Sequence, residues 1–270
     1  MTPFGTRLHT AIADRGPLCV GVDPHAALLT EWGLGDDAGG LETFALTVVE
    51  AVAPVASVLK PQSAFFERFG SRGIAVLERV IAEARAAGAL VLLDVKRGDI
   101  GSTSQAYADA YLDPSSPLAS DAITVSPFLG FGSLDPFVDT ARRHGAGLFV
   151  LALTSNKEGP EVQHARAEGG GTVAGLMLDH LRRLNADASP LGSFGAVVGA
   201  TIGSTTEDLA FNGPVLAPGF GAQGGTTHDV RRLFGAAAAV LPSSSRDVLR
   251  LQDPSAMRDA VTRTNDELRR

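Results

Sequence analysis

The chain contains short apolar segments that recur at intervals and are rich in β-branched residues. Within each segment the apolar positions are continuous, without the polar alternation of a half-exposed strand. Continuous apolar runs of this length are typical of parallel strands that are covered on both faces. They predict eight strands, at residues 18–22, 55–59, 89–93, 122–125, 147–153, 195–200, 214–217 and 236–241.

The segments between these runs have helical spacing of apolar positions and contain good helix formers. The clearest predicted helices are at residues 42–53, 73–88, 171–188 and 254–270. Strand and helix therefore alternate along the chain, which indicates the α/β class. Eight such units in a chain of this length predict a (β/α)₈ TIM barrel, and an open doubly wound sheet is the alternative.

Composition favours one soluble globular unit. The 270 residues are 44% hydrophobic and 20% charged, and barrels of this size commonly form one domain, so we expect a single domain over residues 1–270. The net charge of −7 argues against a nucleic-acid or anionic-membrane partner. The N-terminus resembles no signal peptide and no apolar stretch is long enough to span a membrane, so we expect a cytoplasmic protein.

The cysteine and histidine content indicates no disulfide and no metal site. Cys19 is the sole cysteine and lies in an apolar run, which predicts a buried structural thiol. The six histidines are scattered and show no metal-ligand spacing. We therefore expect no metal.

Polar residues at the ends of the predicted strands are the candidates for chemistry, because a barrel enzyme has its active site there. These residues are Asp23, Lys60, Asp94 with Lys96, Ser155 after Thr154, and the SSSRD segment at 243–247. Each alone could be a solvated turn or a helix cap.

Asp94 and Lys96 stand out because residues i and i+2 of a strand point to the same face. A structural ion pair is the alternative, although a buried pair is a weak source of stability. Asp99 follows Gly98 and could simply be a carboxylate near a helix N-terminus.

Two late segments have the composition of an anion site. Residues 218–226, PGFGAQGGT, follow the seventh predicted strand and precede a helix expected to begin at about Thr226. Arg246 lies just after the eighth strand, and its guanidinium can bind phosphate bidentately. Because the loops after strands seven and eight often form the phosphate site of a barrel, we predict one here. The unpatterned segment 159–171 is expected to be a mobile surface loop or a lid.

The segment DVKRGDIGST, residues 94–103, resembles the D-x-K-x-x-D-I-x-x-T signature of the orotidine 5′-phosphate decarboxylase family. The matching residues are Asp94, Lys96, Asp99, Ile100 and Thr103. Further similar blocks follow in order along nearly the whole chain: VGVDP at 20–24, LKPQSAFFERFG at 59–70, TSN at 154–156, PGFGAQGG at 218–225 and SSSR at 243–246. The 59–70 and 154–156 blocks resemble the longer bacterial branch of this family.

This resemblance implies decarboxylation of orotidine 5′-monophosphate to uridine 5′-monophosphate and carbon dioxide, without metal or organic cofactor. It would be the last step of new pyrimidine synthesis. The resemblance implies that Lys96 donates the proton to C6, that Asp94 lies beside the substrate carboxylate, and that Lys60 orients Asp94 and the ribose.

The resemblance also implies substrate contacts from several other residues. In a homodimer, Asp99, Ile100 and Thr103 would reach the site of the partner subunit. The remaining implied contacts are Asp23 on a ribose hydroxyl, Ser155 on the pyrimidine amide edge, and Gln223 and Arg246 at the phosphate, where Gly225 and Ser245 complete the set. Ser126 departs from the amide residue usual at its position, so we leave it out of the site.

Two other classes stay open on the residues alone. One is a different phosphate-binding barrel enzyme, either a metal-dependent sugar-phosphate decarboxylase or a Schiff-base aldolase. The other is a catalytically silent phosphate-binding or interaction protein.

Overall fold

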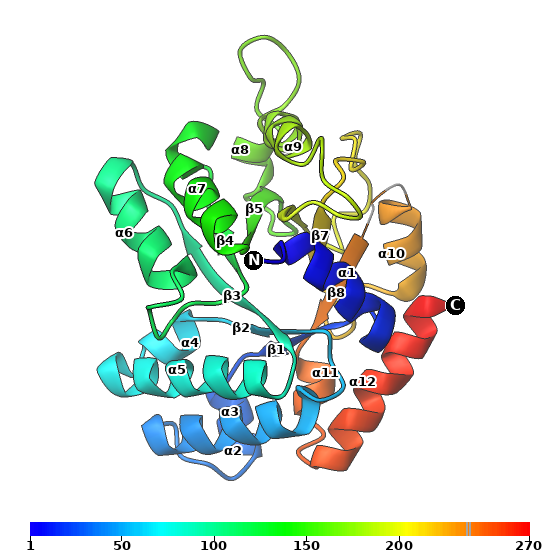
Figure 1. The fold of residues 1–270 in the computed structure, drawn as a ribbon. Helices are drawn as coiled ribbons and strands as arrows, with labels where there is room; N and C mark the ends of the chain where they lie inside the picture. Colours follow the sequence, from blue (N-terminus) through cyan, green and yellow to red (C-terminus); the bar gives the residue numbers. More distant parts are fainter. Residues whose placement is uncertain (236, 238) are drawn as a thin grey trace.

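Eight parallel strands close into a barrel with helices around it (Figure 1). The structure is a computed structural model that describes residues 1–235, 237 and 239–270. Each strand pairs with the next, and pairing of Cys19 with Ser243 joins the last strand to the first. The predicted (β/α)₈ barrel is thus confirmed, and the open-sheet alternative is wrong. The strands are β1 Cys19–Val22, β2 Val58–Pro61, β3 Leu90–Arg97, β4 Ala122–Val125, β5 Gly147–Leu153, β6 Phe194–Val198, β7 Pro214–Pro218 and β8 Ala239–Ser244.

The predicted strands overlap the observed ones, but β2 covers Val58–Pro61 where 55–59 was predicted, and β6 ends at Val198 where 200 was predicted. The largest extensions are at two carboxyl ends. β3 continues to Arg97 and β8 to Ser244, beyond the apolar runs that predicted them. In both cases the strand continues as polar residues, so apolar patterning could not reveal its end. Residues 236 and 238 of the predicted last strand lie outside the described residues.

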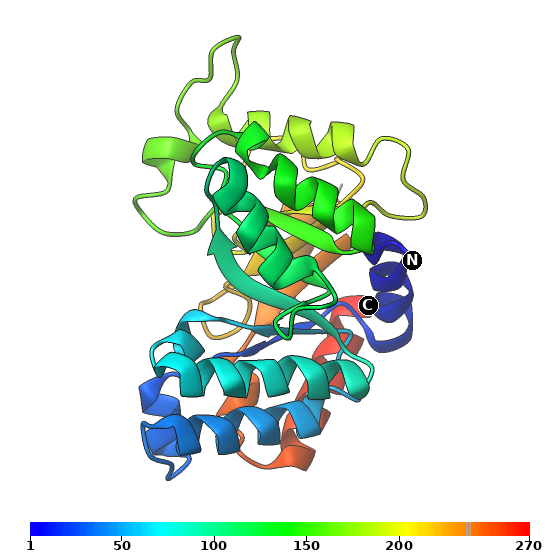
Figure 2. The ribbon, with the colours of Figure 1, turned by 60° about the vertical axis from the view of Figure 1, so that its left-hand side comes forward.

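The helices cover the outside of the barrel. Each of the four clearest predicted helices corresponds to an observed one, namely α3, α5, α9 and α12. Figures 1 and 2 show α3 and α5 side by side outside the strands. The helices are α1 Phe4–Arg15, α2 Ala26–Glu31, α3 Ala38–Val52, α4 Ala64–Glu67, α5 Gly70–Ala86, α6 Gly101–Leu112, α7 Asp135–His144, α8 Pro160–Gln163, α9 Val173–Leu184, α10 Thr227–Phe234, α11 Arg246–Leu249 and α12 Pro254–Arg269, with a 3₁₀ turn at Phe131–Leu134.

Helix α5 illustrates why these segments are helical. Its buried residues Val76, Leu77, Val80, Ile81 and Ala84 recur at intervals of one and three residues, which places them on one face. That face packs on the barrel, and burial of each large aliphatic side chain stabilises the fold by about 1.5–3 kcal/mol.

The barrel interior is filled at its amino end. Phe4 and Leu8 of α1 are fully buried and pack with Cys19, Val58 and Leu92 from the strands. Helix α1 lies across this end of the barrel (Figure 1). Cys19 is buried as predicted, and burial raises the pKa of its thiol to about 12. The interior is therefore apolar at one end, and polar side chains gather at the other.

The segment at residues 159–171 lies at the surface. It contains α8 and a turn closed by pairing of Arg166 with Thr172, and it extends away from the barrel (Figures 1 and 2). Its expected mobility or lid function stays a prediction. Among the helices of the described residues, none is long and apolar enough to cross a membrane.

Candidate active site

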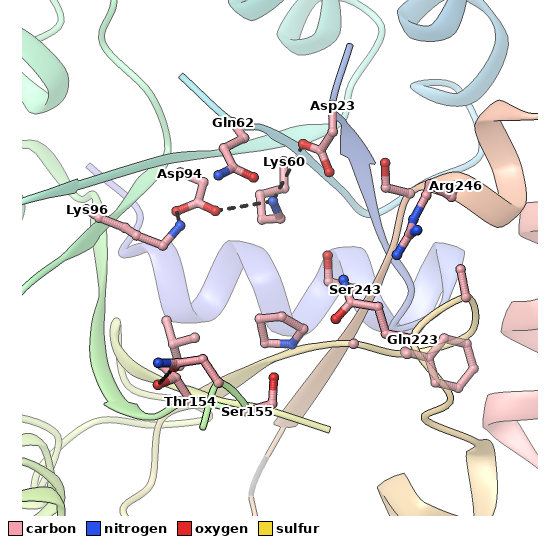
Figure 3. A pocket seen from close by; sticks show the side chains of 18 of the residues that line it. Asp23, Lys60, Gln62, Asp94, Lys96, Thr154, Ser155, Gln223, Ser243 and Arg246 are labelled. Carbon is pink, nitrogen blue, oxygen red and sulfur yellow. Dashed lines mark hydrogen bonds and ion pairs between the residues drawn. The ribbon is translucent and has the colours of Figure 1, made fainter. Parts of the chain in front are cut away.

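A cavity of about 330 Å³ opens at the carboxyl ends of the strands (Figure 3). It receives side chains from the ends of β1, β2, β3, β5, β7 and β8, as expected where parallel strands end together in a barrel. Eight residues predicted from the sequence line it: Asp23, Lys60, Asp94, Lys96, Ser155, Gln223, Ser245 and Arg246. Residues as far apart in the chain as Asp23 and Arg246 are thus brought to one site.

Four charged groups of alternating sign lie at one side of this cavity. The Nζ of Lys60 is 3.3 Å from Asp94 Oδ2 and 3.8 Å from Asp23 Oδ1. The Nζ of Lys96 donates to the other oxygen of Asp94, Oδ1, at 2.6 Å. Asp94 therefore holds an ammonium group on each of its two oxygens, and Figure 3 shows the four side chains directed towards the cavity.

Burial and charge act in opposite directions on this array. Lys60 is 5% exposed, and its burial disfavours the ammonium, but the carboxylates of Asp23 and Asp94 outweigh burial and raise the pKa of Lys60. Burial likewise disfavours the ionised Asp94. The charges of Lys60 and Lys96, with hydrogen bonds from Lys96 and Thr124, outweigh that effect and lower the pKa of Asp94 to about 2. Asp94 is therefore a carboxylate and Lys60 an ammonium at neutral pH.

Lys96 reaches Asp94 through an irregular strand end. Leu93 and Arg97 of β3 pair with Ile123 and Val125 of β4, so three residues of β3 lie opposite Thr124 alone. Within this bulge Lys96 has φ +47°, a left-handed conformation that costs a non-glycine residue about 1–3 kcal/mol. The prediction that Asp94 and Lys96 share a face is confirmed, but the regular strand alternation on which it was based is wrong.

The other side of the cavity is formed by the two loops predicted to bind an anion. Gln223 comes from the loop after β7, and Ser245 and Arg246 come from the segment after β8. The carboxylate of Asp247 joins these loops by accepting from the amide of Ala222 at 2.7 Å. A Cβ at residue 221 would lie 2.0 Å from that carboxylate, so glycine is required at this point.

The glycine-rich loop ends as the sequence predicted. Thr226 caps α10, and its hydroxyl accepts from the amide of Asp229. Gly225 does not line the cavity. Its amide donates to the carbonyl of Gly219 at 3.0 Å and its carbonyl accepts from Gly221 at 2.8 Å, so it shapes the loop that carries Gln223.

The loop after β5 supplies a third wall. Ser155 lies there between Thr154 and Asn156, and all three residues line the cavity. Thr154 donates to the side chain of Asn156 at 2.6 Å and accepts from Gln163 of α8 at 2.7 Å. The amide and hydroxyl groups of this wall face the charged array across the cavity (Figure 3).

The remaining predicted site residues lie outside this cavity. Asp99 accepts from the amide of Ile100 at 2.8 Å, Ile100 is 62% exposed, and Thr103 lies exposed on α6. Ser126, which we left out of the site, also lies outside, and its amide donates to the carbonyl of Arg97. Within one chain, Asp99, Ile100 and Thr103 do not line the cavity that Asp94 and Lys96 line.

Sequence reasoning assigned no role to the cavity residues Gln62, Thr154, Asn156 and Ser243, or to Thr124, which binds Asp94. Gln62 lines the cavity one position after β2 ends, beside Lys60 and Asp94 in Figure 3. Thr124 is 1% exposed and donates to Asp94 Oδ1 at 2.7 Å. Gln62 could have been found as a polar residue beyond a strand end, whereas Thr124 looks in sequence like any β-branched strand residue.

No group of three or more histidine, cysteine, aspartate or glutamate side chains is arranged to hold a metal ion in residues 1–235, 237 and 239–270. The fold and the cavity define a barrel enzyme in which lysine and carboxylate side chains alternate at one end of a site and an arginine and a glutamine stand at the other. The model of the orotidine 5′-phosphate decarboxylase / HUMPS family matches residues 16–260. The chain belongs to this family.

Relatives and solved structures agree with this assignment. An orotidine 5′-phosphate decarboxylase from Nocardioides sp. is 88% identical over 100% of both chains. One from Streptomyces coelicolor is 63% identical over 100% of this chain and 98% of the relative. A crystallised protein from Streptomyces avermitilis is 62% identical with a TM-score of 0.98, covering 100% of this chain and 95% of its own. The OMP decarboxylase of Leishmania donovani is 30% identical with a TM-score of 0.77 over 99% of each chain.

Proposed function

We propose that this enzyme decarboxylates orotidine 5′-monophosphate to uridine 5′-monophosphate and carbon dioxide, the last step of pyrimidine nucleotide synthesis, with no metal or organic cofactor. The observation that carries the proposal is the array of Lys60, Asp94 and Lys96 in a cavity that has Arg246 at its other side. A nucleotide with an anionic phosphate at one end and a reacting carboxylate at the other matches this distribution of charge.

The proposed chemistry needs fixed positive charge at one carbon. When the bond between C6 and the carboxylate breaks, its electron pair stays on C6, where no conjugated group accepts it. The ammonium of Lys96 stabilises that charge and transfers a proton from Nζ to C6. Lys96 is left neutral and takes a proton from solvent before the next turnover.

Lys60, Asp94 and Lys96 hold one another in place without substrate. Asp94 binds both ammonium groups at 3.3 and 2.6 Å, so their positions need little rearrangement when the transition state forms. Asp94 also lies beside the position proposed for the substrate carboxylate.

The proposed phosphate contacts are remote from the reacting bond. Gln223 and Arg246 would bind the phosphate, with Gly225 and Ser245 in the loops that surround it. Asp23 would bind a ribose hydroxyl, and Ser155 the amide edge of the pyrimidine. Binding energy gained at the phosphate can be used to order the 218–226 loop and align the reacting groups.

We further propose a homodimer in which Asp99, Ile100 and Thr103 reach the site of the partner subunit. Ile100 is 62% exposed, and the nearby β4 loop exposes Phe128 at 75% and Leu129 at 53%. Large apolar side chains that stay exposed on a single chain are typical of an interface. We place the enzyme in the cytoplasm, where a nucleotide substrate and the rest of its pathway would be found.

The direct test adds orotidine 5′-monophosphate to protein that has been dialysed against EDTA. We expect uridine 5′-monophosphate and carbon dioxide in equal amounts, at the same rate as without the chelator, because the chain's own ammonium groups supply the charge. Product can be quantified by chromatography. Loss of activity in EDTA, restored by a divalent metal, would instead indicate a metal-dependent decarboxylase, and inactivation by borohydride with substrate would indicate a Schiff base at a lysine.

A further inference from the structure

Thr124 forms a closed ring of hydrogen bonds with the two residues at the centre of the site. Its Oγ1 accepts from the backbone amide of Lys96 at 2.9 Å and donates to Asp94 Oδ1 at 2.7 Å. The same carboxylate oxygen accepts from Lys96 Nζ at 2.6 Å. One hydroxyl thus connects the main chain of the proposed proton donor to the carboxylate that holds its ammonium group.

The irregular strand pairing explains why a hydroxyl is needed at residue 124. In the bulge, Asp94, Val95 and Lys96 lie opposite this one residue, so the ladder is interrupted at the Lys96 amide. The hydroxyl of Thr124 accepts from that amide in place of a strand carbonyl. Because Thr124 is 1% exposed, water cannot replace it without rearrangement.

The bonding also fixes the direction of the hydroxyl proton. A hydroxyl has one proton to donate, and the Lys96 amide already approaches the oxygen as a donor. The proton of Thr124 is therefore directed at Asp94. Asp94 Oδ1 is held from two sides, while Oδ2 faces Lys60.

We infer that Thr124 is a positioning residue, whose hydroxyl holds the Lys96 backbone in its left-handed conformation and orients the Asp94 carboxylate between the two ammonium groups. It is not among the residues that line the cavity, so it acts through Lys96 and Asp94 without touching substrate. The inference rests on the proposed function, since it assigns Thr124 a part in that reaction.

The test compares three variants in steady-state assays with orotidine 5′-monophosphate. Thr124→Val keeps the shape of the side chain but removes the hydroxyl. It should lower kcat about 10- to 100-fold, the change in rate that corresponds to the free energy of one hydrogen bond to a charged group. KM should change little, because the substrate contacts remain. Thr124→Ser restores the hydroxyl and should recover most of kcat.

Thr140→Val is the matched control. Thr140 is also fully buried, and its hydroxyl accepts from Gln105 at 3.1 Å on the outside of the barrel. This variant should lower stability without lowering kcat. A fall in kcat equal to that of Thr124→Val would show that lost packing or stability is responsible, and would overturn the inference, as would an unchanged kcat in Thr124→Val.

A second measurement does not depend on turnover. The carboxyl carbon of Asp94, followed by NMR as pH is lowered, should titrate at higher pH in Thr124→Val than in the wild type, because the ionised form has lost a hydrogen bond. An unchanged titration would overturn the inference even in an active enzyme. If the wild type did not decarboxylate the nucleotide, the proposed function would fail, and the titration would still decide whether Thr124 controls Asp94.

Discussion

Replacement of Lys96 by alanine should lower kcat by at least about 10⁴-fold, because it removes both the proposed proton donor and the positive charge proposed to lie beside the developing carbanion. The protein should still fold, since the Lys96 side chain is 45% exposed and Asp94 keeps its contact with Lys60. Binding of uridine 5′-monophosphate should persist through the phosphate and ribose contacts. Rates of carbon dioxide release and the dissociation constant of the product measure the two effects separately.

Lys157 gives a matched control for this substitution. The chain contains three lysines, and the side chain of Lys157 is 91% exposed and pairs only loosely with Glu158, at 3.9 Å. Lys157→Ala should therefore leave kcat unchanged. If Lys96→Ala kept about a tenth of the wild-type rate, more than loss of a general acid permits, the role of Lys96 as proton donor would be wrong.

Mixing of two inactive variants should restore activity if the proposed dimer shares its sites. Asp99→Ala removes the residue proposed to reach the partner's site. Lys96→Ala removes the proposed proton donor from the substituted subunit's own site. In a purified heterodimer of the two variants, one site lacks both groups and the other keeps both. The heterodimer should therefore have about half of the wild-type activity, whereas each homodimer is nearly inactive.

Differently tagged subunits allow the heterodimer to be isolated before its activity is measured. Thr103 and Ile100 are exposed on the same segment as Asp99, and none of them lines the cavity of its own chain. A confirmed heterodimer with no more activity than its parent homodimers would contradict the shared site. An active Asp99→Ala homodimer would contradict the role of Asp99 itself.

The fold could be predicted because strands that are buried on both faces appear in the sequence as continuous apolar runs. Strands such as β4 and β5 are continuous apolar runs, and all residues of β4 are buried. The same reasoning failed where polar residues continue a strand. β3 and β8 extend through Lys96 and Ser244, since side chains that face a polar cavity do not continue the apolar pattern.

The charged residues of the site could be predicted because they stand directly after apolar runs, where a barrel has its cavity. Lys60, Asp94 and Lys96 were found in this way. The left-handed φ of Lys96 and its hydrogen bond to Thr124 could not be predicted, because both depend on the register between β3 and β4. The sequence around residue 96 does not determine how β3 pairs with β4.

The central claim is that a nucleotide binds with its phosphate at Arg246 and its pyrimidine C6 at Lys96. A crystal structure with uridine 5′-monophosphate tests it most directly. We predict that Lys96 Nζ lies about 3–3.5 Å from C6, the separation of groups about to react, and that Arg246 and Gln223 contact the phosphate. A nucleotide bound in the reverse direction, or with C6 beyond reach of the Lys96 ammonium, would contradict the account.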